Sequence, residues 1–190
     1  MSVTTSSKRI FFDLNHPADF HFFKHTIHYL QQNGFLIRIV ARDKECLQSL
    51  LREQGFSFIS RGKGSSSKTG KYLYAVYNLI VIFFQLLKFR PALTLCLSSP
   101  YLILTSKILH IPCLTWDDTD YNPRLLPLIK KATYIISPAS YPFNFHTYHF
   151  HIHTFKELAY LNPHYYPKAG QVNRNGLFFR FTRMDTIHHE

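Results

Sequence analysis

The chain has 190 residues, of which 46% are hydrophobic and 16% are aromatic. This length supports one domain with a substantial core, and the apolar content excludes an intrinsically disordered protein. The formal net charge of +11 predicts attraction to polyanions such as nucleic acid, anionic lipids or phosphorylated sugars. Three cysteines without C-x-x-C spacing indicate neither a disulfide framework nor a zinc knuckle, and no secretory signal is recognised, so we expect a cytoplasmic protein.

Strand-like and helix-like segments alternate along the chain. The patterns predict strands at Lys8–Asn15, Phe35–Arg42, Phe56–Ser60, Ala92–Pro100, Pro112–Asp118 and Ala132–Pro138. They predict helices at Phe20–Gln32, from a cap at Asp43 to Gln54, at Tyr72–Phe89, at Tyr101–Leu109 and near Arg124–Lys131. This order predicts an α/β fold, a Rossmann-like doubly wound sheet of mostly parallel strands with helices on both faces.

Polar clusters follow three of the predicted strands. They are Asp13–His16, Ser98–Pro100 and Trp116–Asp120. In a doubly wound sheet, ligands bind beyond the carboxyl ends of the strands, so three clusters there favour an active-site edge. His16 is a candidate general base or hydroxyl contact, because imidazole titrates near neutral pH. The alternative is that Asp13 and Asn15 only form a turn and cap the next helix.

Other polar residues have two interpretations each. His21 lies in the first turn of the predicted helix and could face the ligand edge, or it is an ordinary surface histidine. The carboxylates of Asp117–Asp120 could orient a sugar hydroxyl, pair with Arg124 or form a solvated loop; no second carboxylate cluster supports a metal site. The alternating histidines His149, His151 and His153 would share one face of a strand. They could bind a transition metal, but a polar strand face is the commoner explanation for such a pattern.

Two basic segments lie in the middle of the chain. The stretch Arg61–Lys71 has the composition of a phosphate cradle but lacks the G-x-x-x-x-G-K-[ST] spacing, which predicts a flexible basic loop. The following segment, Tyr72–Phe89, is apolar almost all round except for Asn78 and Gln85. It is either a buried helix or a helix whose apolar face lies on a membrane surface, and its flanking lysines and arginines support the second alternative.

The character of the sequence changes after Tyr141. Histidines, aromatic residues and prolines dominate Phe143–Lys168, and an apolar strand then begins near Asn175. We therefore expect a Rossmann-like domain at 8–140, an inter-domain crossover at 141–174 and the first strand of a second domain at 175–190, the rest of which is missing.

Four segments in order resemble the domain-of-unknown-function 354 family: FDLNHPADFHFFK, SSPYL through SKILHIPCLTWDDTD, FKELAYLNPHYYPK and LFFRFTRMDTIHH. Members are similar to GT-B proteins, in which two Rossmann-like domains face each other across a cleft, as in UDP-sugar glycosyltransferases and UDP-N-acetylglucosamine 2-epimerases. The sequence departs from the family at Asp19, where a histidine is usual, and at Ser98, where a glycine is usual.

The resemblance implies roles for residues in both halves of such an enzyme. Catalytic roles fall on His16 as base and on Asp13, Asn15, His21 and Asp117; substrate-binding roles fall on Ser99, Asp118, Arg180, Asp185 and His188. The implied substrates are a nucleotide-sugar and a sugar or lipid-linked acceptor for polysaccharide or glycoconjugate assembly, with no cofactor and no metal.

The chain itself would be the N-terminal half of such an enzyme, inactive alone and completed by a separate C-terminal half. One alternative is a fragment of a UDP-sugar 2-epimerase. Another, from a different class, is a basic non-catalytic module that binds an anionic membrane or nucleic acid. No RRM, KH or helix-turn-helix signature appears, so we do not expect nucleic acid as a partner, while peripheral contact with the inner membrane face stays open.

Overall fold

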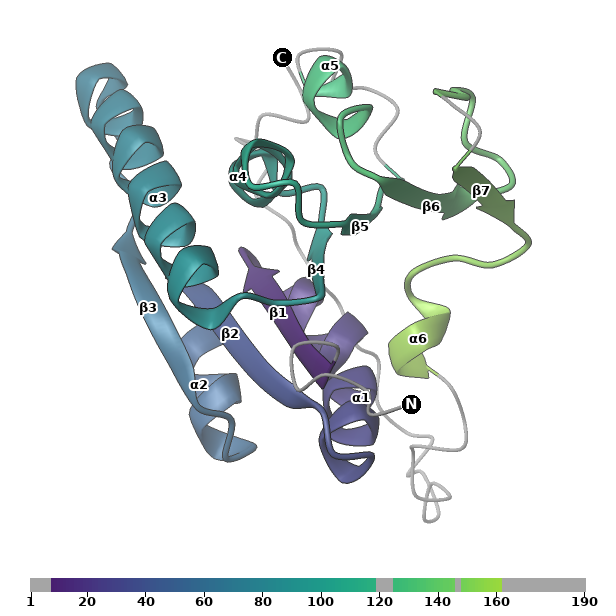
Figure 1. Cartoon of the computed structure of the whole chain (residues 1–190), viewed down its shortest axis with the longest axis horizontal. Coiled ribbons are helices and arrows are strands. Elements are labelled where there is room, and N and C mark those ends of the chain that lie inside the picture. Colours follow the sequence, from purple (N-terminus) through teal and green to yellow (C-terminus); the bar gives the residue numbers. More distant parts are fainter. Residues whose placement is uncertain (1–7, 119–124, 146–147, 162–190) are drawn as a thin grey trace, which may run out of the picture.

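A single seven-stranded parallel sheet organises the protein. The computed structural model describes residues 8–118, 125–145 and 148–161 (Figure 1). The strands follow the order β3-β2-β1-β4-β5-β6-β7, and each neighbouring pair is parallel. The chain starts in the interior of the sheet, winds outward to β3 and then returns to build the other half. This order is that of a doubly wound fold, which confirms the predicted Rossmann-like α/β class.

The elements have the following bounds. The strands are β1 (Arg9–Leu14), β2 (Leu36–Asp43), β3 (Phe58–Lys63), β4 (Leu93–Leu97), β5 (Cys113–Trp116), β6 (Tyr134–Pro138) and β7 (His149–Ile152). The helices are α1 (Pro17–Gln32), α2 (Leu47–Glu53), α3 (Lys68–Phe89), α4 (Pro100–Ile108), α5 (Leu126–Ile129) and α6 (Leu158–Leu161).

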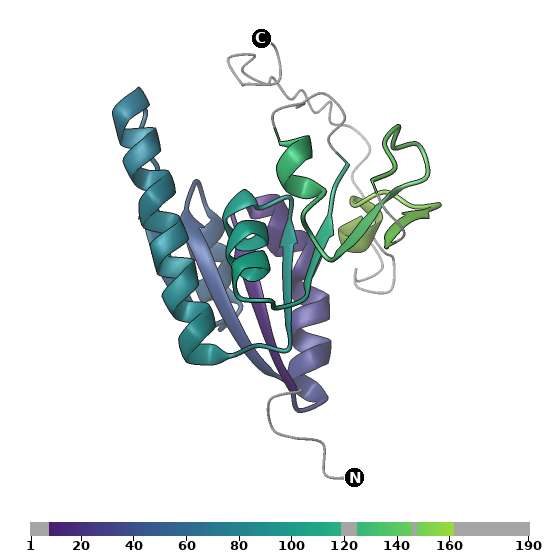
Figure 2. The ribbon, with the colours of Figure 1, turned by 45° about the horizontal axis from the view of Figure 1, so that its top comes forward.

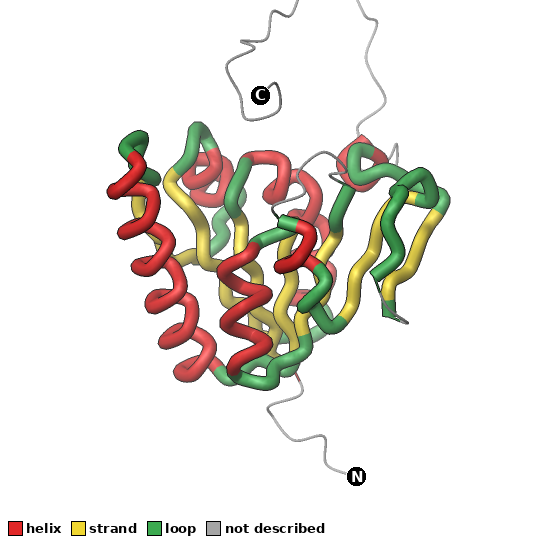
Figure 3. The backbone as a smooth tube through the Cα atoms, turned by 90° about the horizontal axis from the view of Figure 1, so that it is seen from above, coloured by secondary structure: helices red, strands yellow, loops and turns green. Residues whose placement is uncertain are grey.

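Helices cover both faces of the sheet (Figures 2 and 3). On one face, α1 and α2 pack against alternate residues of β1, including Phe12 and Leu14. On the other face, α3, α4 and α5 pack around Phe11 and Val40. Side chains alternate along a strand, so the residue two positions after Phe11, which is Asp13, belongs to the face covered by α3 and α4.

The helix that follows β1 begins earlier than the sequence predicts. His16 is its N-cap and Pro17 its first residue, a favoured position for proline, so the start predicted at Phe20 was wrong. The predicted cap at Asp43 was also wrong, since β2 continues through Asp43 and the next helix begins after Cys46. Pairing of Asp43 with Lys63 on β3 explains the longer strand.

The predicted flexible loop from Arg61 to Lys71 is ordered at both ends. Strand β3 runs to Lys63, so Arg61 belongs to the sheet and is fully buried. At the other end, the Ser67 hydroxyl accepts a hydrogen bond from the Gly70 N–H and caps α3, whose first turn contains Lys68 and Lys71. Strand pairing and a serine cap therefore shorten the loop from both sides.

The last described strand lies in the segment predicted as an inter-domain crossover. β7 pairs in parallel with β6, with Phe150 opposite Ile136, and extends the sheet by one strand. Beyond it, α6 lies beside α1 (Figure 1). The predicted strand at 175–190 lies outside the described residues, so the division of the chain into domains stays a prediction.

Candidate functional site

The topology places a switch point between two neighbouring strands at the centre of the sheet. β1 connects outward to β2, whereas β4, on its other side, connects toward β5, so the strand order reverses between β1 and β4. Asp13 lies near the carboxyl end of β1, opposite Cys96 of β4. In open α/β sheets, this switch point is where ligands bind.

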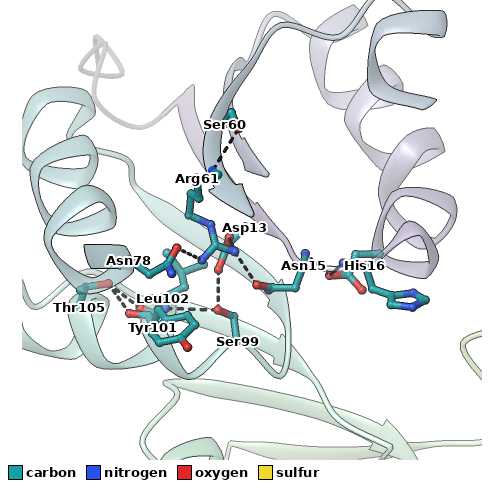
Figure 4. A network of polar contacts seen from close by, with 12 residues as sticks. Asp13, Asn15, His16, Ser60, Arg61, Asn78, Ser99, Tyr101, Leu102 and Thr105 are labelled. Atoms are coloured by element: carbon teal, nitrogen blue, oxygen red, sulfur yellow. Dashed lines mark hydrogen bonds and ion pairs between the residues drawn. The ribbon is translucent and has the colours of Figure 1, made fainter. Parts of the chain in front are cut away.

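A buried ion pair lies directly beneath this edge (Figure 4). Arg61 Nη2 of β3 lies 2.8 Å from Asp13 Oδ1 of β1, and both side chains are completely inaccessible to solvent. The same guanidinium nitrogen donates to Asn15 Oδ1 at 2.5 Å, and Nη1 donates to Asn78 Oδ1 of α3 at 2.7 Å. Arg61 therefore joins β1, β3 and α3, and it fixes the amide of Asn15 at the ligand edge.

Helix α4 is tied into the same network. Ser99 is its N-cap, and the Ser99 hydroxyl donates to Asp13 Oδ2 at 2.5 Å. With one oxygen against Arg61 and the other against Ser99, the buried carboxylate of Asp13 holds structural elements together. These contacts favour a positioning role for Asp13 and Ser99, with Asn15 as the member that reaches the partly exposed surface.

A second buried carboxylate fixes the ends of β4, β5 and β6. Asp117 Oδ1 accepts a hydrogen bond from the Ser98 hydroxyl at 2.6 Å, and Oδ2 accepts one from the hydroxyl of Tyr141. Ser98 has a φ of 48°, a left-handed conformation that suits glycine. The hydroxyl of Ser98 gains a hydrogen bond to Asp117 that a glycine in this position could not make.

The neighbouring carboxylate, Asp118, connects the edge to the end of the described chain. Asp118 Oδ2 lies 2.9 Å from Lys156 Nζ, and both side chains are partly exposed. Lys156 opens the motif K-E-L-A-Y-L, whose helix α6 lies beside α1. The sheet edge and this motif, far apart in sequence, therefore meet at one surface.

His16 lies at the same edge and has a defined tautomer. Its Nδ1 accepts a hydrogen bond from the backbone N–H of Ala18 at 3.2 Å, which caps α1. A neutral imidazole carries one proton, so that proton is on Nε2, which lies 3.5 Å from Glu45 Oε1. Partial burial and then the charge of Lys44 lower the pKa of His16, so the ring is neutral at physiological pH. In this geometry His16 donates through Nε2, and accepting a proton at Nδ1 requires the cap to open.

The cap makes a separate prediction for stability. Replacing His16 with alanine is expected to lower the free energy of unfolding by about 0.5–2 kcal/mol, because the Ala18 N–H loses its acceptor. His16→Asn offers an oxygen to the same N–H and is expected to stay close to wild type. Urea unfolding at pH 7.5 compares the three proteins. Equal destabilisation by alanine and asparagine would show that the cap is not what His16 contributes.

Asp19 completes the turn between β1 and α1. Its Oδ2 accepts hydrogen bonds from the backbone N–H groups of Asn15 at 2.6 Å and His16 at 3.3 Å, so cap and carboxylate form a capping box. Burial raises the pKa of Asp19 to about 7, with a smaller contribution from the charge of Asp13. The turn that presents Asn15 and His16 is therefore sensitive to protonation near neutral pH.

The remaining predicted site residues are less closely associated. His21 lies in the second turn of α1 because the helix begins at Pro17; burial and the charge of Lys24 lower its pKa. The Ser137 hydroxyl lies 2.8 Å from His149 and 3.2 Å from His151. Among the described residues, no group of three His, Cys, Asp or Glu side chains could hold a metal ion. Arg180, Asp185 and His188, like Thr119, Asp120 and Arg124, lie outside the described part of the chain.

Sequence reasoning missed three members of the site: Arg61, Asn78 and Tyr141. The sequence predicts Arg61 in a loop and Asn78 as a polar interruption of an apolar helix. One signal was available, because a carboxylate predicted inside a buried strand, such as Asp13, needs a cationic partner. Nothing in the sequence identified that partner among 22 lysines and arginines.

A hollow of about 510 Å³ lies at the opposite edge of the sheet. Its lining comes from the amino ends of β5 and β6 and includes Lys107, Lys130 and Lys131. No residue predicted for the site lines it. At the carboxyl edge, Asn15, His16 and Asp118 are partly exposed.

Comparisons with known proteins find similar folds among solved structures alone. No protein-family model matches the sequence, and no curated protein matches it. Among solved structures, the UDP-GlcNAc 2-epimerase from Methanocaldococcus jannaschii aligns with a TM-score of 0.55 and 14% identity over 68% of this chain and 39% of that chain. MurG from Acinetobacter baumannii aligns with a TM-score of 0.58 and 13% identity over 72% of this chain and 43% of that chain.

A third structure is similar to the same extent. The UDP-GlcNAc 2-epimerase from Neisseria meningitidis bound to UDP-GlcNAc aligns with a TM-score of 0.54 and 12% identity over 68% of this chain and 40% of that chain. At such identities the likeness concerns the fold, which is that of the N-terminal domain of GT-B proteins. The chain spans about two fifths of the length of these structures.

Proposed function

We propose that this chain is the N-terminal, acceptor-side half of a sugar-nucleotide enzyme that transfers a glycosyl group in polysaccharide or glycoconjugate assembly. The observation that carries the proposal is the buried Arg61–Asp13 ion pair at the switch point, which fixes Asn15 where ligands bind in this fold. A charged pair buried at this position is expensive to maintain and adds little to stability compared with apolar residues. The presence of the ion pair therefore supports a functional role for the carboxyl edge of the sheet, which the pair holds in place.

Glycosyl transfer requires an acceptor hydroxyl to be oriented and to lose its proton as the bond from sugar to diphosphate breaks. In the proposed mechanism, the partly exposed groups Asn15 and Asp118 orient the hydroxyl. His16 receives the proton at Nδ1 when the ring releases the Ala18 N–H. The diphosphate would be held by a second domain, to which Arg180, Asp185 and His188 are assigned by the family resemblance alone. Asp117 acts as a positioning residue through its hydrogen bonds to Ser98 and Tyr141. His21, on α1, contributes a contact at the border of the site.

A related reaction is the second candidate. Two of the three similar structures described above are UDP-GlcNAc 2-epimerases, so an epimerase fragment would use the same edge. The two reactions differ in their products, because transfer joins the sugar to an acceptor, while epimerisation returns a nucleotide-sugar with its 2-position inverted. Product analysis by mass spectrometry and NMR distinguishes them. We place either activity in the cytoplasm, in agreement with the free cysteines Cys46, Cys96 and Cys113.

The enzymatic test compares the 190-residue chain with a two-domain protein in which a GT-B C-terminal domain is joined after Glu190. The chain alone is expected to show no turnover of UDP-sugars, because one wall of a cleft neither holds the diphosphate nor excludes water. The two-domain protein is expected to consume UDP-GlcNAc or another UDP-sugar. A folded two-domain protein that consumes none of them would contradict the proposal.

The role of His16 is tested in the same two-domain protein. His16→Asn keeps an acceptor for the helix cap and is expected to lower kcat about 100-fold or more, the usual contribution of a general base. Glu45→Gln, which changes the neighbour of Nε2 and leaves the imidazole in place, is the matched control. Full turnover by His16→Asn would remove His16 from the mechanism.

A further inference from the structure

Helix α3 has two faces with opposite surroundings. Its buried residues Asn78, Ile82, Leu86 and Phe89 form one stripe against the rest of the domain. At about 100° per residue, the opposite side of the helix carries exposed apolar residues, which are Leu73, Val76, Tyr77, Ile80, Phe84 and Leu87. The helix lies at the margin of the molecule, so this outer face is open along its length (Figures 1 and 3).

The outer face of α3 is unusually apolar for a surface. Phe84 and Leu73 are each 62% exposed and Ile80 is 50% exposed. The two polar residues in this part of the helix are turned to internal partners, Asn78 to Arg61 and Gln85 to Arg38. By length and mean hydropathy α3 passes as a membrane-crossing helix, yet its inner stripe is part of the domain core, so crossing would dismantle the fold. A contiguous exposed apolar face of this kind marks an interaction site.

Positive charge lies at one end of the outer face. Lys88 and Arg90 flank the apolar stripe on its two sides at the carboxyl end of α3, whereas Lys68 and Lys71 in the first turn lie on the side of the inner stripe. Between Glu53 and Asp117 the sequence contains no Asp or Glu, while it contains seven Lys and Arg. An apolar stripe flanked by basic residues and free of acidic ones matches the interface of a bilayer with anionic headgroups.

We propose that the outer face of α3 docks this protein on an anionic membrane surface, with the helix lying in the plane of the interface. Tyr77 on this face is of a residue type that favours the headgroup region. A second copy of the chain in parallel orientation fits less well, because it would bring Lys88 and Arg90 of the two copies together.

Arg90 offers a guanidinium group that could bind a lipid phosphate at this surface. It ends α3 in a left-handed conformation with a φ of 50°, where glycine is favoured and arginine is strained. Arg90 also lines a hollow of about 480 Å³ together with apolar residues, including Leu87, Pro91 and Leu109. A cation at the border of an apolar hollow is complementary to an amphiphile with an anionic head and an apolar tail.

Vesicle co-sedimentation of the full chain tests the proposal. The chain is expected to bind phosphatidylcholine vesicles that contain about 30 mol% phosphatidylglycerol. Binding is expected to weaken about fivefold when Lys88 or Arg90 is replaced with a neutral residue. Phe84→Ser is expected to reduce binding at least tenfold, as expected for loss of one buried aromatic side chain. Tyr29→Ser is the matched control, because Tyr29 is 65% exposed on α1, which covers the other face of the sheet.

Arg90→Gly separates membrane contact from folding. Glycine relieves the left-handed backbone, so the melting temperature is expected to stay equal or rise, while binding to anionic vesicles falls about fivefold. Three outcomes would overturn the proposal. They are equal sedimentation with and without phosphatidylglycerol, equal binding by Phe84→Ser and wild type, and a dimer in analytical ultracentrifugation that Phe84→Ser dissociates.

Discussion

Replacing Arg61 with methionine is expected to lower the free energy of unfolding by about 3–5 kcal/mol, the largest effect of any substitution considered for this protein. Methionine fills much of the volume of the arginine side chain but leaves the carboxylate of Asp13 buried without its cation. The Asn15 and Asn78 side-chain oxygens lose their donor at the same time. Urea unfolding at pH 7.5, followed by circular dichroism, measures the change.

The control for Arg61→Met is Lys63→Met on the same strand. Lys63 is exposed, so its replacement is expected to change stability by less than about 0.5 kcal/mol. The double variant Asp13→Asn with Arg61→Met is expected to be more stable than Arg61→Met alone, because it removes the buried charge. If Arg61→Met unfolds like Lys63→Met, the ion pair does not hold the edge of the sheet as described.

Raising the pH from about 4 to 8 is expected to destabilise the protein through Asp19. In the unfolded chain this carboxyl ionises near 3.8, whereas in the folded protein its pKa is about 7. Between these values the folded state binds the extra proton, so the contribution of Asp19 is fully present below 3.8 and is lost as the pH rises through 7. A shift of this size corresponds to about 4 kcal/mol.

Asp19→Asn removes this ionisation and keeps an oxygen for the backbone N–H groups of Asn15 and His16. Relative to wild type, the variant is expected to gain stability progressively from pH 5 to pH 8. Asp43→Asn, at an exposed carboxylate, is expected to show no such trend. Urea unfolding midpoints of the three proteins at pH 5, 6, 7 and 8 test whether Asp19 causes the loss of stability with rising pH. A gap between Asp19→Asn and wild type that is constant with pH would contradict the assignment.

The fold class followed from patterns that are local in sequence. Apolar runs such as those around Phe11 and Leu95 predicted strands, and their alternation with helices predicted a doubly wound sheet. Polar residues after a strand, such as Asn15 and His16, could be assigned to one edge because parallel strands all end there. These inferences needed no knowledge of contacts between distant residues.

Contacts between distant residues account for what the sequence could not predict. Arg61 reads as part of a basic loop until pairing with β2 extends β3 and turns the side chain toward Asp13. Asn78 looks unfavourable in an apolar helix until Arg61 is placed beside it. The alternation of His149 and His151 allowed a strand in this segment, but its place as β7 depends on pairing with β6.

The candidate site likewise contains residues whose roles the sequence could predict and residues whose roles it could not. The sequence identified Asn15, His16 and Asp118, which are partly exposed at the edge. It did not separate them from Asp13, Ser99 and Asp117, which burial makes positioning residues. Residue type and spacing alone do not distinguish a carboxylate that meets substrate from one that meets a buried arginine or tyrosine.

The central claim is that the carboxyl edge of the sheet is the wall of a sugar-nucleotide cleft. A titration of the ¹⁵N-labelled two-domain protein with UDP-GlcNAc at millimolar concentration, followed by amide NMR shifts, tests this most directly. The account predicts shifts at Asn15, His16 and Asp118, with no comparable change at Ile111 and Ala132 beside the hollow at the opposite edge. Shifts confined to that hollow, or no shift at any described residue, would contradict it.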